Sequence, residues 1–483
     1  MTSYEAVRQY EEDYNLIPVC KEIFSDIITP IILLRKLAQV DKNYYLLESV
    51  EGGERWGRYS FMGFNPVLHV TCKAGAVTVK SGEIVTKTAE NPMDALRRLL
   101  NGYKTPHIDG LPPFTGGFVG YFSYEMIGYA EPKLKIKQND FKDYDLMLFD
   151  KVIAFDHLRQ KISIVANYKA EDGEQGYHAA RLELEKIIHL IHDPAPLQPL
   201  KADTDPVFTC NTTKDQYCLM VEQAKKYIRE GDIFQAVLSR RFEAEYHSSL
   251  LNTYRVLRTT NPSPYMYFIQ CEEVQIAGAS PETMIKLVDG KLTTFPVAGT
   301  RPRGKTQEED LALEKELLLD EKELSEHNML VDLARNDVGR IAKYGSVQVE
   351  DYMKIHRFSK VMHIASVVTG EIRDDKDSCD TVAALLPAGT LSGAPKFRAC
   401  EIIDELETEA RGIYGGAIGY LDFSGNLDVC IAIRTAVKKG NKVYVQAGAG
   451  IVADSIPENE YEECANKAGA VIEAIKKASE VGL

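Results

Sequence analysis

The stretch MIKLVDGKLTTF, Met284–Phe295, decides the fold class. Two apolar runs flank Asp289-Gly290, and an Asp-Gly pair suits the positive φ angles of a two-residue turn. The stretch therefore predicts an antiparallel hairpin. Further along the chain, predicted strands at 427–437 and 442–448 flank KKGN in the same way. Towards the N-terminus, residues 67–87 alternate apolar and polar side chains around Gly-containing turns, which is typical of meandering antiparallel strands.

Helices are predicted between these strands. Thr213 can cap a helix that ends at Gly231. Ser455 and Glu458 have the spacing of a capping box, with Pro457 in the first turn of a C-terminal helix. Hairpins with interspersed helices argue against regular βαβ winding and predict an α+β fold of antiparallel β-sheets packed with helices.

A proline-rich segment divides the chain. Residues 193–206 contain four prolines in fourteen positions, so they cannot sustain a helix or a central strand. We predict an N-terminal region at 1–192, a linker at 193–206 and a catalytic domain at 207–483. GGFVGYFSY at 116–124 resembles GGAIGYLDF at 415–423, and either an internal repeat or chance similarity of Gly-rich strands explains this.

Composition excludes several classes of protein. The 483 residues carry a net charge of −14, which disfavours nucleic acid as a partner, and 45% hydrophobic residues disfavour wholesale disorder. Nine cysteines, an odd number without a CxxC pair, disfavour a disulfide framework or a zinc site. No export signal or membrane span is expected, so the sequence predicts a protein of the reducing cytoplasm.

Two glutamates are candidate metal ligands. Helical spacing places Glu326 on an apolar stripe, so its charge needs a cation, either a metal or a basic residue such as Arg335 or Arg340. Glu463 lies in the acidic first turns of the C-terminal helix, where it can serve the helix dipole instead. Two carboxylates from separate helices would suit Mg²⁺, which takes few protein ligands.

Two further features leave alternatives open. Gly448, Ala449 and Gly450 follow a predicted strand, and their backbone N–H groups can approach an anion or simply form a tight turn. His363 lies in an apolar run, where it is either a hydrogen-bonded core residue or a catalytic one.

The motifs together carry a resemblance over about 15–478. The chain resembles the anthranilate synthase component I group of the chorismate-utilising enzyme family, in which antiparallel sheets pack with helices. The resemblance rests on these motifs: LLESVEGGERWGRYSFMG, GDIFQAVLSRRF, NPSPYMYF, GASPE, PVAGTRPRG, SEHNMLVDLARND, HRFSKVMH, PAGTLSGAPK, GIYGGAIGY, CIAIRT and QAGAGIVADS to YEECANKA.

The resemblance implies a Mg²⁺-dependent reaction of chorismate with ammonia that gives anthranilate and pyruvate, the first step of tryptophan synthesis. Glu326 and Glu463 match the metal ligands of the family. The positions that match substrate contacts are Gly299, Thr300, Tyr414, Arg434, Gly448, Ala449 and Gly450. Arg434 suits this role because a guanidinium can grip a carboxylate through two charge-assisted bonds.

The resemblance also implies catalytic roles. Glu282 matches a general acid that must be kept protonated, and His363 matches a histidine of the hydroxyl-loss and elimination steps. Gln235 stands where isochorismate- and salicylate-forming members place a lysine that activates water, so ammonia is favoured. Ala298 stands where aminodeoxychorismate synthases carry a nucleophilic lysine.

Regulation and partners follow from the same resemblance. Tryptophan-sensitive members bind this effector with two segments, which here contain Leu47, Glu48 and Ser49, and Asn261, Pro264, Tyr265 and Met266. A glutamine amidotransferase subunit, component II, is expected to supply ammonia, in a heterotetramer. The alternatives are an aminodeoxyisochorismate synthase or another chorismate-family synthase, and a non-catalytic tryptophan sensor.

Overall fold

The structure is a computed structural model that describes residues 2–49, 57–200, 205–357 and 361–481. Three predicted features fall partly outside the described residues. They are positions 50–56 of the LLESVEGGERWGRYSFMG motif, 201–204 of the proline-rich segment, and 358–360 of the HRFSKVMH motif.

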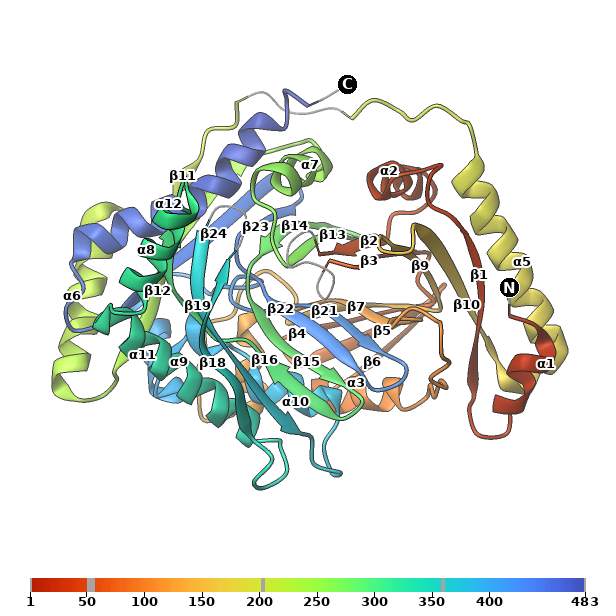
Figure 1. Ribbon diagram of the computed structural model, residues 1–483, viewed down its shortest axis with the longest axis horizontal. Helices are drawn as coiled ribbons and strands as arrows, with labels where there is room; N and C mark the ends of the chain where they lie inside the picture. Colours follow the sequence, from red (N-terminus) through yellow and green to blue (C-terminus); the bar gives the residue numbers. More distant parts are fainter. Residues whose placement is uncertain (1, 50–56, 201–204, 358–360, 482–483) are drawn as a thin grey trace.

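Two large antiparallel sheets form the centre of the described chain (Figure 1). Sheet A has the order β1-β10-β9-β3-β2-β13-β14-β23-β24-β12-β11, and β20 also pairs with β12. Its strands are β1 (Leu16–Phe24), β2 (Tyr44–Glu48), β3 (Tyr59–Phe64), β9 (Lys151–Asp156), β10 (Lys161–Lys169), β11 (Thr209–Cys210), β12 (Gln235–Glu245), β13 (Tyr265–Cys271), β14 (Val274–Ser280), β20 (Gly393–Ala394), β23 (Thr435–Lys439) and β24 (Lys442–Ile451).

Sheet B has the order β17-β19-β16-β15-β22-β21-β7-β8-β4-β5-β6, and β18 also pairs with β19. Its strands are β4 (Leu68–Lys73), β5 (Ala76–Ser81), β6 (Ile84–Thr88), β7 (Gly117–Phe122), β8 (Tyr144–Phe149), β15 (Thr283–Val288), β16 (Lys291–Thr294), β17 (Val297–Pro302), β18 (Gln348–Arg357), β19 (Val361–Glu371), β21 (Ala417–Asp422) and β22 (Leu427–Ile431).

Helices cover the outer faces of both sheets. The α-helices are α1 (Tyr4–Val7), α2 (Pro30–Val40), α3 (Pro92–Leu100), α4 (Ile127–Ala130), α5 (Gly173–His192), α6 (Lys214–Glu230), α7 (Leu251–Thr260), α8 (Gln307–Leu317), α9 (Glu321–Gly339), α10 (Ser378–Leu385), α11 (Lys396–Leu406) and α12 (Pro457–Lys477). Short 3-10 helices are η1 (Arg8–Tyr10), η3 (Tyr124–Met126), η4 (Ala170–Asp172) and η5 (Gly389–Leu391). In the described chain, none of these helices is both long and apolar enough to cross a membrane.

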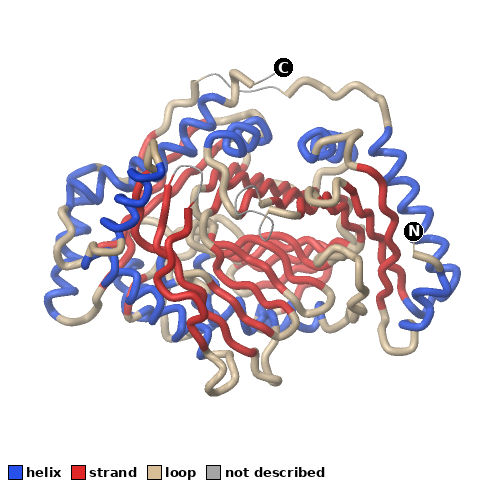
Figure 2. The backbone as a smooth tube through the Cα atoms, viewed as in Figure 1, coloured by secondary structure: helices blue, strands red, loops and turns tan. Residues whose placement is uncertain are grey.

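The layers explain where the core lies. Helices α2, α5, α7 and α12 pack on sheet A, and α3 and α10 pack on sheet B (Figure 1). Figure 2 shows the strands gathered between these helical layers. An aromatic core that includes Tyr45, Phe149 and Tyr267 joins strands of sheet A to strands of sheet B. The α+β prediction is therefore confirmed. All nine cysteines are described, and all are free.

Both predicted hairpins form. β15 and β16 pair antiparallel, and Asp289 and Gly290 both have positive φ, at 49° and 81°, as a tight hairpin turn requires. β23 pairs with β24 in the same manner. The helix predicted after Thr213 is also confirmed as α6, since Thr213 and Gln216 form a capping box and Gly231 ends the helix with left-handed geometry.

The two Gly-rich segments that resemble each other lie side by side. β7 pairs with β21, with Gly120 opposite Gly419. A β-carbon on either glycine would lie 2.0 Å from a carbonyl oxygen, that of Asp145 in β8 or that of Asp428 in β22. Outward from this pair, β8, β4 and β5 correspond to β22, β15 and β16. The same strand order therefore occurs twice, which supports an internal repeat over chance similarity.

Both sheets contain strands from before and after the proline-rich segment. In sheet A, β2 from the N-terminal region pairs with β13 from the later part of the chain. The division at 193–206 stays a prediction about organisation along the sequence.

Two sequence predictions were wrong. The single strand expected at 427–437 is two strands in different sheets, β22 and β23, because the chain crosses between the sheets at 432–434 and Arg434 has a φ of 52°. Ser455 does not cap α12: the N-cap position is Ile456, and the Ser455 hydroxyl accepts a 3.1 Å hydrogen bond from the backbone N–H of Val452. Pro457 does occupy the first turn.

Candidate active site

Strands β12 and β24 form one wall of the site. Gly450 lies opposite Val237, and Gly448 lies opposite Ser239. A β-carbon on Gly450 would lie 2.5 Å from Nε2 of Gln235, and one on Gly448 would lie 2.9 Å from the hydroxyl of Tyr414. The absence of a side chain at these two glycines therefore lets Gln235 and Tyr414 pack closely against the β24 backbone.

Ala449 differs from its two neighbours. Its side chain is fully buried in an apolar cluster that α6, α11 and α12 form with β12 and β24. A contact between Ala449 and a ligand would therefore use the backbone.

Arg434 lies where the chain crosses between the sheets. Its φ of 52° is in the left-handed region that L-residues rarely adopt. Burial lowers the pKa of Arg434, while Tyr414 and Glu463 act in the opposite direction. Within the described ranges Arg434 makes no ion pair, so its guanidinium can receive an anionic group.

Glu282 lies between β14 and β15. Burial raises the pKa of Glu282 to about 7, against smaller lowering effects of a hydrogen bond from Thr390 and the charge of Lys467. The Thr390 hydroxyl donates that bond over 2.8 Å. A cavity of about 40 Å³ lies against Glu282, with Leu333 and Asp337 in its lining. A carboxyl group with this pKa can hold a proton near neutral pH and release it.

Helices α9 and α12 bring carboxylates together. Burial raises the pKa of Glu326, and the nearby charges of Glu323 and Glu463 raise it further, while Lys322 and Lys467 oppose this. Glu326 and Glu463, predicted from separate helices, thus share one electrostatic environment. Like charges in a partly buried site favour the uptake of a cation.

The sequence analysis missed two residues of this cluster on α12. Burial and the charge of Glu463 raise the pKa of Glu460. Lys467 lies 2.6 Å from the carboxylate of Glu463 and donates a 3.2 Å hydrogen bond to the carbonyl oxygen of Gly448. Spacings of three and four residues from Glu463 place both on the same helix face, as they place Glu323 beside Glu326, and that signal could have found them.

The alternative partners proposed for Glu326 are excluded. Arg335 pairs with Asp332 at 2.9 Å, and Arg340 pairs with Glu131 at 2.8 Å. A salt bridge to either arginine therefore does not compensate the charge of Glu326.

The carboxylate cluster fits a divalent cation only in part. Among the described residues, no group of three or more His, Cys, Asp and Glu side chains is arranged to hold a metal ion. One carboxylate oxygen of Glu463 is engaged by Lys467. However, oxygen donors from Glu326 and Glu463, with the carboxylates of Glu323 and Glu460 nearby, match the few protein ligands that Mg²⁺ uses.

His363 lies on β19 opposite Thr300 of β17. Its Nδ1 is 2.9 Å from the carbonyl oxygen of Gly299 and 3.0 Å from Oγ1 of Thr300. A carbonyl can only accept, so this contact favours a proton on Nδ1 and leaves Nε2 as the basic nitrogen. A β-carbon on Gly299 would lie 3.3 Å from Oε2 of Glu323 in α9, which places Gly299 and its partner His363 beside that helix.

The two predicted effector segments meet in sheet A. Met266 of β13 lies opposite Glu48 of β2. Glu48 is buried, and it accepts hydrogen bonds from the Tyr254 hydroxyl at 2.6 Å and from Nε of Arg258 at 2.5 Å. Glu48 therefore joins β2 to α7, the helix that precedes the second segment.

The second segment connects α7 to β13. Asn261 is the C-cap residue of α7, and Pro264 immediately precedes β13. Tyr265 lies opposite Ser280 at the end of β14, two residues before Glu282. Leu47 pairs with β13, and Ser49 directly follows β2, so all seven predicted effector positions lie on or beside these adjoining strands.

The family is decided by comparison with known proteins. Residues 42–473 match the family described as chorismate binding enzyme. The chain belongs to the chorismate-binding enzyme family. The predicted family resemblance is therefore confirmed.

Relatives of this family match the chain over nearly its whole length. It is 46% identical to "Anthranilate synthase component 1" of Acetivibrio thermocellus, with 99% of each chain covered. It is 44% identical to the protein of the same name from Aquifex aeolicus, with 99% of this chain and 98% of that one covered.

A crystal structure of anthranilate synthase component I from Streptococcus pneumoniae TIGR4 has a TM-score of 0.78 and 38% identity, and covers 93% of this chain and 98% of that one. The menaquinone-specific isochorismate synthase MenF of Escherichia coli has a TM-score of 0.70 at 20% identity, with 97% of each chain covered. At 20% identity, this second likeness shows a shared fold alone.

Proposed function

We propose that the protein is the chorismate-converting subunit of an anthranilate synthase. The reaction combines chorismate and ammonia and releases anthranilate, pyruvate and water, the first step of tryptophan synthesis. The observation that carries the proposal is the near-complete match to relatives named anthranilate synthase component 1, at 42–46% identity. Gln235 and Ala298 support it, because neither side chain can activate water or form a covalent amine adduct.

Binding of the substrate follows from the charges in the site. Chorismate is a dianion, and Arg434 makes no ion pair in the part of the chain that the structure describes. Its planar fork can take a carboxylate through two hydrogen bonds. The backbone at Gly448 and Gly450 offers further polar groups to the substrate, because neither residue carries a side chain of its own.

Proton transfer is assigned to two side chains. Hydroxide is a poor leaving group, so the ring hydroxyl needs a proton, and Glu282 with its raised pKa can donate one. Loss of the pyruvyl group and aromatisation require removal of a ring proton. Nε2 of His363 is suited to a step of this kind, because the contact with Gly299 favours the proton on Nδ1.

Mg²⁺ is proposed as the cofactor. Glu326 and Glu463 would hold it, with Glu323 and Glu460 adding negative charge around the site. The ion would supply positive charge to the ring carboxylate of chorismate when bound. Lys467 would then keep its bond to Gly448 and stay beside Glu282.

Feedback inhibition by tryptophan is proposed for the paired segments of β2 and β13. The end of β13 lies beside the end of β14, which leads to Glu282. A ligand that binds one arrangement of these strands better than another would shift the position of the general acid.

Ammonia is proposed to come from a glutamine amidotransferase subunit, component II, in a heterotetramer located in the cytoplasm. Relatives named component 1 support a separate second component. The free cysteines, most of them buried, suit a reducing compartment.

The product of turnover tests the proposal. Purified protein is incubated with chorismate, Mg²⁺ and an ammonium salt, and the product is analysed by mass spectrometry. Anthranilate is expected. An amino intermediate that retains the pyruvyl group would instead identify an aminodeoxyisochorismate synthase, and tryptophan binding without turnover would identify a sensor.

A further inference from the structure

Among the described residues, no strand pairs continuously with one edge of β12. β24 pairs with residues 236–245 of β12 on one side. On the other side, the ladders that the structure describes join β20 to Gln235 and Ala236, and β11 to Phe242 and Glu243. Between these pairings, the N–H of Val237 bonds to Ser392 and the backbone of Arg241 bonds to Asn211. The carbonyl of Val237 and the N–H of Ser239 need other partners, because an unpaired buried N–H or C=O group is costly.

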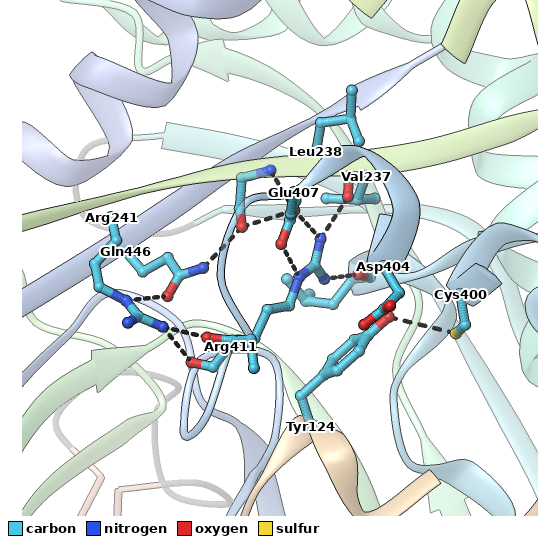
Figure 3. A network of polar contacts seen from close by, with 12 residues as sticks. Tyr124, Val237, Leu238, Arg241, Cys400, Asp404, Glu407, Arg411 and Gln446 are labelled. Atoms are coloured by element: carbon cyan, nitrogen blue, oxygen red, sulfur yellow. Dashed lines mark hydrogen bonds and ion pairs between the residues drawn. The ribbon is translucent and has the colours of Figure 1, made fainter. Parts of the chain in front are cut away.

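A buried ion pair fills this gap (Figure 3). Oε1 of Glu407 accepts a 2.7 Å hydrogen bond from the backbone N–H of Ser239, and Nη2 of Arg411 donates a 2.6 Å bond to the carbonyl of Val237. The two side chains bind each other through a 2.9 Å bond from Nε and a 2.6 Å bond from Nη2. The pair thus takes the place of a neighbouring strand opposite Gly448 and Gly450.

The same guanidinium reaches two other walls of the site. Nη1 of Arg411 donates a 2.6 Å hydrogen bond to the carbonyl of Leu391, the residue after Thr390, which binds Glu282. The guanidinium carbon lies 5.7 Å from the ring centre of Tyr414 and 4.6 Å from that of Tyr124. β12, the Thr390–Leu391 turn and the segment that carries Tyr414 therefore all meet at the side chain of Arg411.

The burial of both charged side chains indicates that the Glu407–Arg411 pair does more than stabilise the fold. Arg411 is 3% exposed and Glu407 is 5% exposed. Burial acts to lower the pKa of Arg411, but the nearby charge of Glu407 raises the pKa overall, so the guanidinium stays charged. Desolvation offsets much of the attraction in such pairs, and apolar pairs of similar volume often stabilise a protein as well. Only a fork of several donors could bind the carbonyls of Val237 and Leu391 and the carboxylate of Glu407 together.

We propose that the Glu407–Arg411 pair is a positioning device for the active site, in which Arg411 is the positioning residue. It holds β12, the Thr390–Leu391 turn and Tyr414 in one arrangement around the substrate. This inference rests on the proposed function for the reaction that the site catalyses. The contacts of Glu407 and Arg411 are observed in the structure and do not depend on that reaction.

The test compares three variants of the full chain. Arg411→Lys keeps the charge and removes the fork, and Glu407→Gln keeps the shape and removes the charge. Arg58→Lys is the matched control, because Arg58 also grips a carboxylate through Nε and Nη2, that of Asp156 in the N-terminal part of the chain. Thermal unfolding and circular dichroism establish which variants are folded at the assay temperature.

For folded Arg411→Lys and Glu407→Gln, we expect kcat/KM for chorismate with ammonium to fall about 10- to 100-fold. We expect kcat to fall and KM to rise. The alkaline limb of the pH profile should also move, because the Thr390–Leu391 turn carries Thr390, the hydrogen-bond partner of Glu282. Arg58→Lys should retain the wild-type values. Variant values within twofold of wild type for the folded protein would overturn the inference.

The two proposals fail in different ways. Absence of anthranilate with the wild-type protein would count against the proposed function alone. Chorismate affinity, measured by calorimetry, then tests the inference: a loss of about tenfold or more in both variants supports it, and unchanged affinity overturns it. If Arg411→Lys does not fold, Glu407→Gln decides by the same criteria.

Discussion

Thr390 donates a 2.8 Å hydrogen bond to the carboxyl group of Glu282. The two residues lie far apart in the sequence: Thr390 is in η5, and Glu282 immediately precedes β15. Burial raises the pKa of Glu282 to about 7, and the bond from Thr390 lowers it, so the value reflects two opposing effects. A general acid must be protonated to work, so the reaction should slow as the pH rises through this pKa.

Replacing Thr390 by valine should shift the alkaline limb of the pH profile. The hydroxyl stabilises the charged form of Glu282, so Thr390→Val should raise the pKa of Glu282 and shift the alkaline limb of kcat/KM upward by about one pH unit. The pH profile of anthranilate formation measures this. Thr381→Val is the control, since Thr381 of α10 donates to the backbone carbonyl of Asp377, the N-cap residue of that helix, and it should leave the limb unchanged. A downward shift in Thr390→Val would contradict the assignment.

Gly450→Ala should impair substrate binding. A β-carbon there would lie 2.5 Å from Nε2 of Gln235, so the amide must move out of its place in the site wall. We expect KM for chorismate to rise about tenfold. The control is Gly469→Ala within α12, where the added β-carbon meets nothing within 4 Å. That variant should keep KM and unfold at a higher temperature, with a gain of about 0.5–1 kcal/mol in the free energy of unfolding.

Glu463→Gln should weaken the response to Mg²⁺. Loss of one carboxylate charge from the pair with Glu326 should raise the Mg²⁺ concentration for half-maximal activity by at least about tenfold. A titration with Mg²⁺ at fixed chorismate measures this. Glu462→Gln removes the same charge from the adjacent position, whose side chain is 63% exposed and weakly paired with Lys214 at 4.0 Å, and should not alter the titration. Identical titrations for the two variants would remove Glu463 from the metal site.

Ser49→Ala should separate regulation from catalysis. If the Ser49 hydroxyl binds tryptophan, its loss should raise the inhibitory concentration about tenfold at unchanged kcat. Calorimetry with tryptophan and inhibition of anthranilate formation should agree. A fall in kcat with unchanged inhibition would assign Ser49 to the active site instead.

Local sequence signals predicted the elements well where the chemistry is local. The Asp289-Gly290 turn and the Thr213 cap depend on neighbouring residues, and both form as expected. The strand at 427–437 could not be divided from sequence, because apolar residues continue through Arg434 and only the two-sheet packing requires the crossing. Ser455 has the correct spacing for a cap, but its hydroxyl binds Val452 instead.

The candidate site was predicted in the same uneven way. The family motifs identified Glu326, Glu463 and Arg434 as site residues. No motif indicated that Lys467 would pair with Glu463 and also donate a hydrogen bond to Gly448. The role of Arg411 depends on the edge of β12 that no described strand covers continuously, which is a property of the assembled sheet. Helical spacing could have placed Lys467 beside Glu463, but no sequence period reveals the contact of Lys467 with Gly448 or the role of Arg411.

The most direct measurement follows nitrogen and pyruvate in one reaction. Wild-type protein is given chorismate, Mg²⁺ and ¹⁵N-labelled ammonium, and the products are quantified by NMR. The account predicts ¹⁵N-anthranilate and pyruvate in equal amounts. Unlabelled isochorismate, or a ¹⁵N-labelled product that retains its pyruvyl group, would contradict it.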